Sequence, residues 1–331
     1  MATALVLAGA VAKGAFEAGV LSVLVERRLE ISAVVATSAG ALNAALFATG
    51  VRLGRGPRTS AKLLSLWRED AHWTRIVQPT WRGLVGRTGL SSVNRLEELV
   101  LRGMEDIVDG PGGAVVPIDL KLVTTSLDGE QRAEDGVVST TFERVLQFSG
   151  PDFDSRGGRE RIARAALASA AFPILFVPAD VPGVGPCVDG GMVNNAPISW
   201  ALGTDVEHVI VVTGEPEPAP PELERGGVEL VGKEVDIAIN ERLFRDLRQA
   251  RRVNRKLEAV RARLQELPID DAAREHVLEA LGWKSLRITE IRPRRPLRGN
   301  AFSALSDAGL RQEYLEVGRE AAQHALDESG A

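Results

Sequence analysis

The chain has 331 residues, of which 44% are hydrophobic and 26% are charged, shares close to those of an average globular protein. Its net charge of -5 and its pI near 5.6 argue against nucleic acid as a main partner, because a phosphate-binding surface needs an excess of basic residues. The single cysteine, Cys187, excludes an intrachain disulfide and favours a reducing, cytoplasmic compartment.

The first fifty residues alternate between buried strands and helices. Residues 3–9 form an apolar run that ends at a glycine, and they predict a strand rather than a secretory signal, because no Lys or Arg precedes Lys13. Residues 15–30 have helical spacing, 32–38 read as a second buried strand, and 39–49 as a second helix. This order predicts a parallel sheet with right-handed crossovers.

The later part of the chain continues the alternation of strands and helices. No stretch of the sequence approaches the ~20 apolar residues that are needed to span a bilayer. Residues 215–227 are rich in Pro and Glu and predict a surface loop. Residues 142–150 fit no single pattern. Helices are expected at 61–69, 92–102, 157–173, 197–202, 228–264 and 306–326, and strands at 116–127, 187–189, 207–214 and 285–293.

Ser38 stands at the turn between the second strand and the second helix, in the pentapeptide A-T-S-A-G. This is one residue away from the G-x-S-x-G of a nucleophile elbow, which needs a sharp turn and small residues two positions before and after the serine. Ala36 and Gly40 meet that need. The alternative is that Ser38 only caps the helix, and the pentapeptide alone leaves both interpretations open.

A glycine-bounded loop, Gly-Ala-Val-Ala-Lys-Gly, joins the first strand to the first helix between Gly9 and Gly14. Backbone N–H groups in such a loop can bind an anion. Val11 stands where a dinucleotide fingerprint needs glycine, and no acidic residue ends the second strand, so nucleotide binding is disfavoured. Further along, Asp189 precedes two glycines. Asp-Gly alone signals a turn, but beside a candidate serine Asp189 becomes a candidate base.

The glycine loop, the serine elbow and Asp-Gly-Gly, in this order, resemble the patatin-like phospholipase family. The resemblance extends over nearly the full chain, through AKGAFEAGVL, TSAGALNAAL, RAALASAAFPILFVP, VDGGMVNNAPISWAL and EIRPRRPL. It implies a three-layer α/β/α fold with a mostly parallel central sheet. Residues 1–214 would form the catalytic core, and residues 215–331 a helical C-terminal extension packed on the same domain.

The resemblance also implies the chemistry. Ser38 would be the nucleophile and Asp189 its base, in a dyad without histidine, and the reaction would be acyl transfer from a lipid ester to serine followed by hydrolysis. Backbone N–H groups of Ala10 and Val11 would hold the oxyanion, with Lys13 as the basic residue of the family beside them.

The resemblance to the family also implies roles for the glycines around the site and indicates which cofactors and partners to expect. Gly9 and Gly14 would bound the oxyanion loop, and Gly190 and Gly191 would support the turn after the aspartate. No metal or organic cofactor is expected, because the sequence has no ligand cluster and the mechanism needs none. The expected partner is a lipid or fatty acyl ester, without nucleic acid, and the expected location is cytoplasmic or peripheral at a membrane.

The four histidines, His72, His208, His276 and His324, lie in no motif, and we expect surface or structural roles for them. An acyltransferase that pairs serine with histidine is therefore disfavoured, because an aspartate stands at position 189.

The sequence departs from the family where Ala10 and Val11 replace glycines. If the loop needs a positive φ at position 11, a β-branched valine is strained there. Two hypotheses follow: an active hydrolase with an altered loop, or a weak or inactive protein with a lipid-binding or regulatory role.

Residues 242–263 form a basic helical stretch that includes Arg251, Arg252 and Arg255. Such a helix can lie on an anionic membrane surface. Packing on the domain is favoured, because its apolar residues fit one stripe, namely Leu243, Phe244, Leu247, Val253, Leu257, Val260 and Leu264.

Overall fold

A computed structural model describes residues 2–76, 94–134, 137–173, 175–201, 206–216, 227–281 and 286–329. These residues build an eight-stranded sheet in the order β5-β6-β3-β2-β1-β7-β8, with β4 paired to β3 outside this path. The strands are β1 Ala2–Leu7, β2 Ala33–Thr37, β3 Asp119–Glu134, β4 Val137–Phe148, β5 Ala179–Val181, β6 Gly185–Val188, β7 Val206–Val212 and β8 Arg287–Ile291.

The five strands β3, β2, β1, β7 and β8 pair parallel with one another in that order. At the β3 edge, β4 and β6 pair antiparallel with β3, and β5 pairs antiparallel with β6. The predicted mostly parallel sheet is therefore confirmed. Residues 142–150, which fit no sequence pattern, fall largely within β4.

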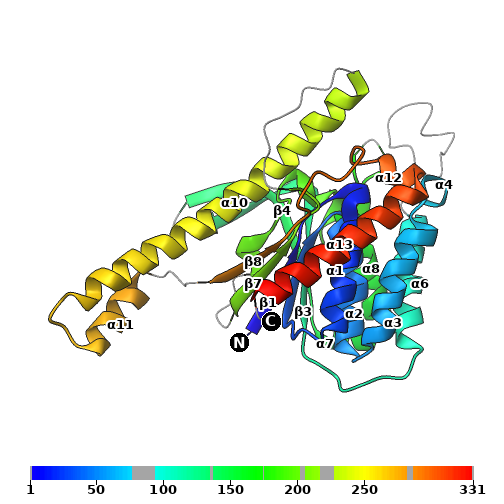
Figure 1. Ribbon diagram of the computed structural model, residues 1–331. Coiled ribbons are helices and arrows are strands. Elements are labelled where there is room, and N and C mark those ends of the chain that lie inside the picture. Colours follow the sequence, from blue (N-terminus) through cyan, green and yellow to red (C-terminus); the bar gives the residue numbers. More distant parts are fainter. Residues whose placement is uncertain are drawn as a thin grey trace.

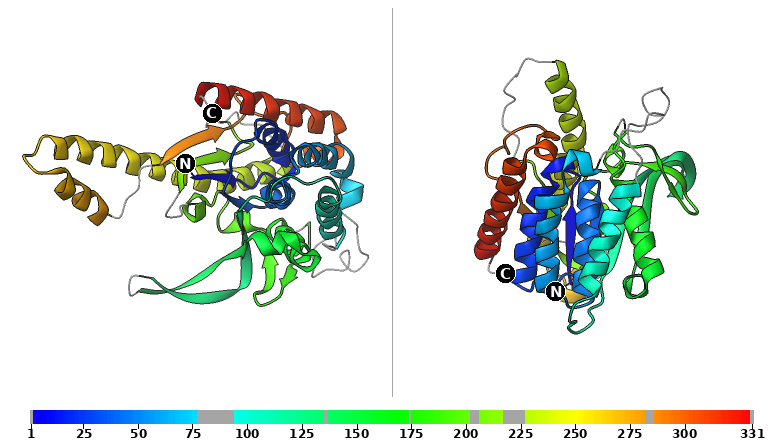
Figure 2. Two further views of the ribbon diagram at one scale, coloured as in Figure 1. Left: turned by 90° about the horizontal axis from the view of Figure 1, so that it is seen from below. Right: turned by 90° about the vertical axis from the view of Figure 1, so that its right-hand side faces the viewer.

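Helices cover both faces of the sheet and give the predicted three layers (Figures 1 and 2). One face carries α1, α2, α3, α6, α8 and α13, and the other carries α9 and α10. The helices are α1 Gly14–Glu26, α2 Ala39–Arg52, α3 Gly56–Ser65, α4 Trp73–Ile76, α6 Asn94–Val108, α7 Gly150–Asp154, α8 Arg156–Ser169, α9 Ile198–Ala201, α10 Gly227–Gln265, α11 Asp271–Ala280, α12 Ser303–Ser306 and α13 Ala308–Ser329.

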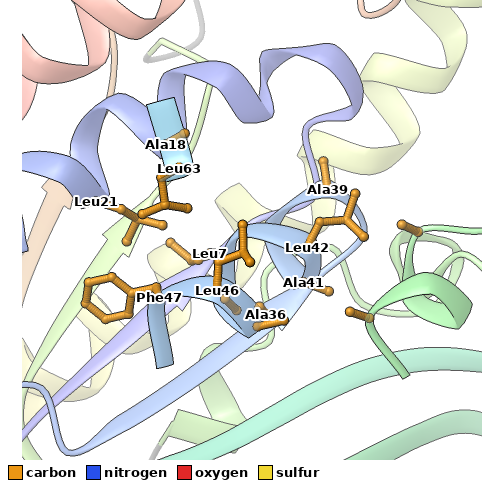
Figure 3. Close-up of a cluster of buried hydrophobic side chains, with 14 of the residues drawn as sticks. Leu7, Ala18, Leu21, Ala36, Ala39, Ala41, Leu42, Leu46, Phe47 and Leu63 are labelled. Carbon is orange, nitrogen blue, oxygen red and sulfur yellow. The ribbon is translucent and has the colours of Figure 1, made fainter. Parts of the chain in front are cut away.

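The central strand β1 shows why the strands read as unbroken apolar runs. Leu5 and Leu7 belong to the larger core under α1 and α2, and Ala4 and Val6 belong to the smaller core under α9 and α10. Successive side chains alternate between the two faces, and both faces are buried. Figure 3 shows Leu7 within the larger core, together with side chains of α1, α2 and α3.

The long helix α10 packs on the sheet through part of its length and extends beyond it, where α11 folds back along it (Figure 1). Leu247 and Leu257 are buried, whereas Arg251, Arg252 and Arg255 are exposed. The Leu243 side chain and most of the expected loop at 215–227 lie outside the described residues. Within the described part of the chain, no helix is both long and apolar enough to cross a membrane.

The C-terminal third contributes to the same layers as the rest of the chain. Strand β8 extends the sheet beside β7, and α13 packs against α1 (Figure 1). From these contacts we propose that residues 215–331 belong to one structural domain with residues 1–214.

Candidate active site

Ser38 is the single residue between β2 and α2, and its backbone is strained. Its φ of +56° and ψ of -130° lie in a sparsely populated region, which typically costs ~1–3 kcal/mol for a residue other than glycine. Ser38 occupies the N-cap position of α2, but its side chain makes no capping hydrogen bond. Its Oγ instead donates to Oδ2 of Asp189 at 2.6 Å.

Small residues stand two positions before and after Ser38, at Ala36 and Gly40. Ala36 is fully buried in β2. A Cβ added to Gly40 would lie 2.9 Å from both the Cβ and the carbonyl oxygen of Leu7, so α2 approaches β1 as closely as only glycine allows.

A buried serine that the sequence did not single out supports the turn from α8. The backbone N–H of Ser38 donates to Oγ of Ser169 at 2.9 Å, and Ser169 Oγ donates to the carbonyl oxygen of Val123 at 2.5 Å. Ser169 therefore satisfies the amide of the strained residue and ties it to strand β3.

Asp189 follows β6 and is held from several directions. Its Oδ1 accepts from the N–H of Gly191 at 2.7 Å, its own N–H donates to Ala171 O at 3.0 Å, and its carbonyl oxygen accepts from Thr125 Oγ1 at 2.8 Å. Gly190 begins the turn that follows, and a Cβ added there would lie 2.1 Å from a β3 carbonyl oxygen. The Asp189 carboxylate is thus fixed with one oxygen free for Ser38.

The surroundings of Asp189 raise its basicity. Burial raises the pKa of Asp189 from its ordinary value of 3.8 to about 6, and hydrogen bonds from Ser38 and Gly191 offset part of the rise. A carboxylate with this pKa is still mainly ionised at neutral pH and accepts a proton more readily than an ordinary aspartate.

The glycine loop begins against Ser38. The N–H of Gly9 donates to Asn195 O at 3.0 Å, and Asn195 Nδ2 donates to Gly9 O at 3.1 Å. A Cβ added to Gly9 would lie 2.8 Å from Ser38 Cβ and 2.2 Å from Asn195 Oδ1, so only glycine fits. Asn195 is a further residue that the sequence analysis did not identify.

The next two residues present unused backbone donors. Val11 has a φ of +46°, so the strain considered from the sequence is present. Among the hydrogen bonds of the described residues, none uses the backbone N–H of Ala10 or of Val11. The loop therefore has two N–H groups that a ligand oxygen can engage.

Lys13 and Gly14 complete the loop but do not line the cavity beside Ser38. The Lys13 ammonium forms an ion pair with Glu215, and its side chain is buried. Gly14 starts α1 against the ring of Trp67, and its carbonyl oxygen accepts from Asn43 Nδ2 at 2.9 Å.

An apolar cavity opens over Ser38 and Asp189, which are the polar side chains among the described residues that line it. Phe172 stacks edge-to-face on Phe302, with their ring centroids 5.8 Å apart. Phe172 and these further described residues line the cavity: Val11, Ala39, Leu42, Trp67, Ile76, Leu96, Ala170, Leu175, Phe176 and Leu305. Such a lining suits a hydrocarbon chain next to the serine hydroxyl.

None of the four histidines lines this cavity. His208 Nε2 contacts Thr289 Oγ1 at 2.9 Å across β7 and β8, and burial lowers its pKa. His72 contacts Thr74, and His324 pairs with Glu328 on α13. Within the described residues, no group of three or more acidic, His or Cys side chains is placed to hold a metal ion.

The sequence model described as patatin-like phospholipase matches residues 5–202, which contain the glycine loop, Ser38 and Asp189. The chain belongs to the patatin-like phospholipase family. Family membership indicates a hydrolase that acts on lipids. Among curated proteins, none matches this patatin-like chain.

The solved structures that this patatin-like protein matches include VipD and ExoU. VipD from Legionella pneumophila aligns with a TM-score of 0.50 and 14% identity, over 99% of this chain and 67% of VipD. The type III effector protein ExoU aligns with a TM-score of 0.38 and 14% identity, over 99% of this chain and 53% of ExoU. The likeness to VipD shows a shared fold.

Proposed function

We propose that the protein is a serine lipid acyl hydrolase in which Ser38 is the nucleophile and Asp189 its base. The observation that carries this proposal is the 2.6 Å hydrogen bond from Ser38 Oγ to Asp189 Oδ2 at the polar end of an apolar cavity. The strained elbow, the raised pKa of Asp189 and the two free N–H groups of the glycine loop support it.

Acylation begins when Ser38 Oγ attacks the ester carbonyl carbon and its proton moves to Asp189 Oδ2. The carbonyl oxygen gains negative charge, which the N–H groups of Ala10 and Val11 stabilise. The tetrahedral intermediate then collapses, the C–O bond to the alcohol breaks, and the alcohol leaves with the proton from Asp189. The acyl group stays on Ser38 as an ester.

Deacylation repeats these steps with water. Asp189 takes a proton from water as the water oxygen attacks the acyl-enzyme carbonyl, and the same loop stabilises the oxyanion. Collapse returns the proton to Ser38 Oγ and releases the fatty acid. Apart from the water molecule, each group that this mechanism uses is a side chain or backbone group of this chain.

The cavity indicates the substrate class. Apart from Ser38 and Asp189, the lining residues that the structure describes are apolar, so the acyl chain of a lipid is the part that the cavity suits. A cytoplasmic location, with at most peripheral contact with a membrane, stays a prediction.

One observation favours a second function, a lipid-binding protein with weak hydrolysis. Val11 lines the cavity and its backbone is strained, and a valine is bulkier than the glycine of the family beside the proposed oxyanion site. Losing a properly placed donor lowers the rate by ~10²–10³.

Hydrolysis of p-nitrophenyl butyrate, octanoate and dodecanoate separates the two functions. We expect kcat/KM to favour the longer chains, and we expect Ser38→Ala and Asp189→Asn each to lower it by at least ~10³. If Ser38→Ala keeps the wild-type rate, the proposed mechanism is wrong. If the wild type binds a fluorescent fatty acid but hydrolyses no ester, the lipid-binding function holds instead.

A further inference from the structure

The glycine loop holds a conformation that its own sequence does not favour. Val11 is β-branched and has a φ of +46°, in the region that favours glycine. Strained backbone of this kind persists only where the surrounding contacts fix it. The contacts at both ends of the loop therefore decide whether the N–H groups of Ala10 and Val11 stay in place.

Each end of the loop is anchored by residues far away in the chain. At the start, Gly9 exchanges two hydrogen bonds with Asn195. At the end, the N–H of Ala12 donates to Ala301 O at 3.0 Å, and Lys13 pairs with Glu215. The ion pair is the side-chain anchor at this end.

Burial makes the ion pair a strong constraint on the position of the loop. The side chain of Lys13 is 8% exposed, and that of Glu215 is 22% exposed. An ammonium group removed from water to this extent needs a partner, because desolvation without one is costly. Lys13 follows Val11 within the same 3-10 turn, so a fixed ammonium also fixes the turn.

Glu215 itself lies three residues beyond the end of an interior strand. It follows β7, the strand beside β1, and its N–H donates to Thr213 Oγ1 at 3.2 Å. A Cβ added to Gly214 would lie 2.9 Å from Lys13 Cβ, so the glycine allows the two segments to approach closely. The carboxylate thus reaches Lys13 from the end of a sheet strand.

We propose that Glu215 is a positioning residue for the oxyanion loop: through Lys13, it keeps the N–H groups of Ala10 and Val11 where the developing oxyanion needs them. This role rests on the function proposed above. Glu215 does not line the cavity, and it lies outside the residues 5–202 that match the family. It acts on the transition state only through the loop.

The test compares Glu215→Gln with a control that disturbs an equally buried pair elsewhere. Arg159 and Glu105 join α8 to α6, with side chains 7% and 28% exposed, so Glu105→Gln removes a similar interaction away from the loop. For the octanoate ester, Glu215→Gln should lower kcat at least about tenfold and change KM less than about threefold. The control should keep kcat.

Hydrogen–deuterium exchange gives a readout that does not depend on hydrolysis. The N–H groups of Ala12 and Lys13 are bonded to Ala301 O and Ala10 O, so their exchange reports whether the end of the loop stays closed. In Glu215→Gln, we expect their exchange to accelerate at least about tenfold, and in Glu105→Gln to stay unchanged.

These readouts distinguish failure of the inference from failure of the proposed function. Wild-type exchange in Glu215→Gln, or an equal loss of kcat in the control, overturns the positioning role. If the wild type hydrolyses nothing, the proposed function fails, and hydrogen–deuterium exchange alone decides the role of Glu215.

A double variant covers the case in which Glu215→Gln does not fold. Lys13→Met/Glu215→Gln leaves no unpaired buried charge and should show the same fast exchange at positions 12 and 13. Slow exchange in the double variant overturns the positioning role.

Discussion

At the scale of single residues, the mechanism proposed for Ser38 and Asp189 makes hydrolysis depend on the charge of one carboxyl group. Asp189 accepts a proton only when it is ionised, and burial raises its pKa to about 6. We therefore expect kcat/KM to rise with pH through about pH 6 and to level off above it, with a tenfold fall for each pH unit below. A pH–rate profile of the wild type checks this, and a constant rate from about pH 5 to about pH 8 contradicts it.

Substitutions at Val11 allow the backbone strain in the glycine loop to be measured directly. At a positive φ, alanine is disfavoured by ~1–2 kcal/mol and glycine is not. Val11→Gly should therefore have a higher free energy of unfolding than Val11→Ala, by about 1 kcal/mol. Urea unfolding measures the difference.

The matched control for Val11 is Glu320, an exposed residue in α13. There Glu320→Ala should be more stable than Glu320→Gly by about 1 kcal/mol, which is the usual order in a helix. The same order at position 11 would show that the loop is not strained.

The sequence alone identified candidate residues where they stand in recognisable patterns. Ser38 was singled out because small residues flank it between a strand and a helix, and Asp189 because Asp-Gly-Gly follows the serine elbow in a family order. Ser169 and Asn195 lie within stretches that resemble the family, and Glu215 begins an expected loop, but no local pattern assigned a role to any of the three. They meet their partners across 131, 186 and 202 residues of chain, and only folding brings them together.

At the scale of elements, α1 and α13 cross at two glycines. A Cβ added to Gly19 would lie 2.2 Å from Leu315 O, and one added to Gly318 would lie 2.1 Å from Phe16 O. Gly318→Ala must therefore push the helices apart, and we expect it to lower the free energy of unfolding by ~1–3 kcal/mol.

Gly157, in the first turn of α8, is the control for this substitution, because an added Cβ there meets nothing within 4 Å. Gly157→Ala should leave stability unchanged or raise it. Thermal unfolding followed by circular dichroism compares the two variants. If Gly318→Ala melts like the wild type, α13 does not pack on α1 as described.

Elements with a mixed environment were the ones that the sequence did not predict. Residues 142–148 of β4 are mostly half-buried, so they show neither an apolar run nor a clean alternation. Helix α11 is largely exposed and lacks an apolar stripe, and β5 has only three residues. Periodicity identifies an element only when burial divides its faces sharply.

At the scale of the whole molecule, the burial of both sheet faces explains why the fold class could be predicted from the sequence. Strands covered on both sides are apolar runs, and their alternation with helices predicts a parallel α/β/α arrangement. The sequence did not predict that the C-terminal segment would reach the site. Leu305 lines the cavity, and Ala301 and Glu215 contact the glycine loop, so residues beyond the family match take part in the surroundings of the site.

The central claim is that Ser38 and Asp189 form an assembled dyad that activates the serine. Covalent labelling of the purified protein by a fluorophosphonate, with the modified residue mapped by mass spectrometry, tests it most directly. We predict labelling at Ser38 in the wild type, and none in Ser38→Ala or Asp189→Ala. A well-folded wild type that stays unlabelled, or labelling of Ser38 that persists in Asp189→Ala, would contradict the account.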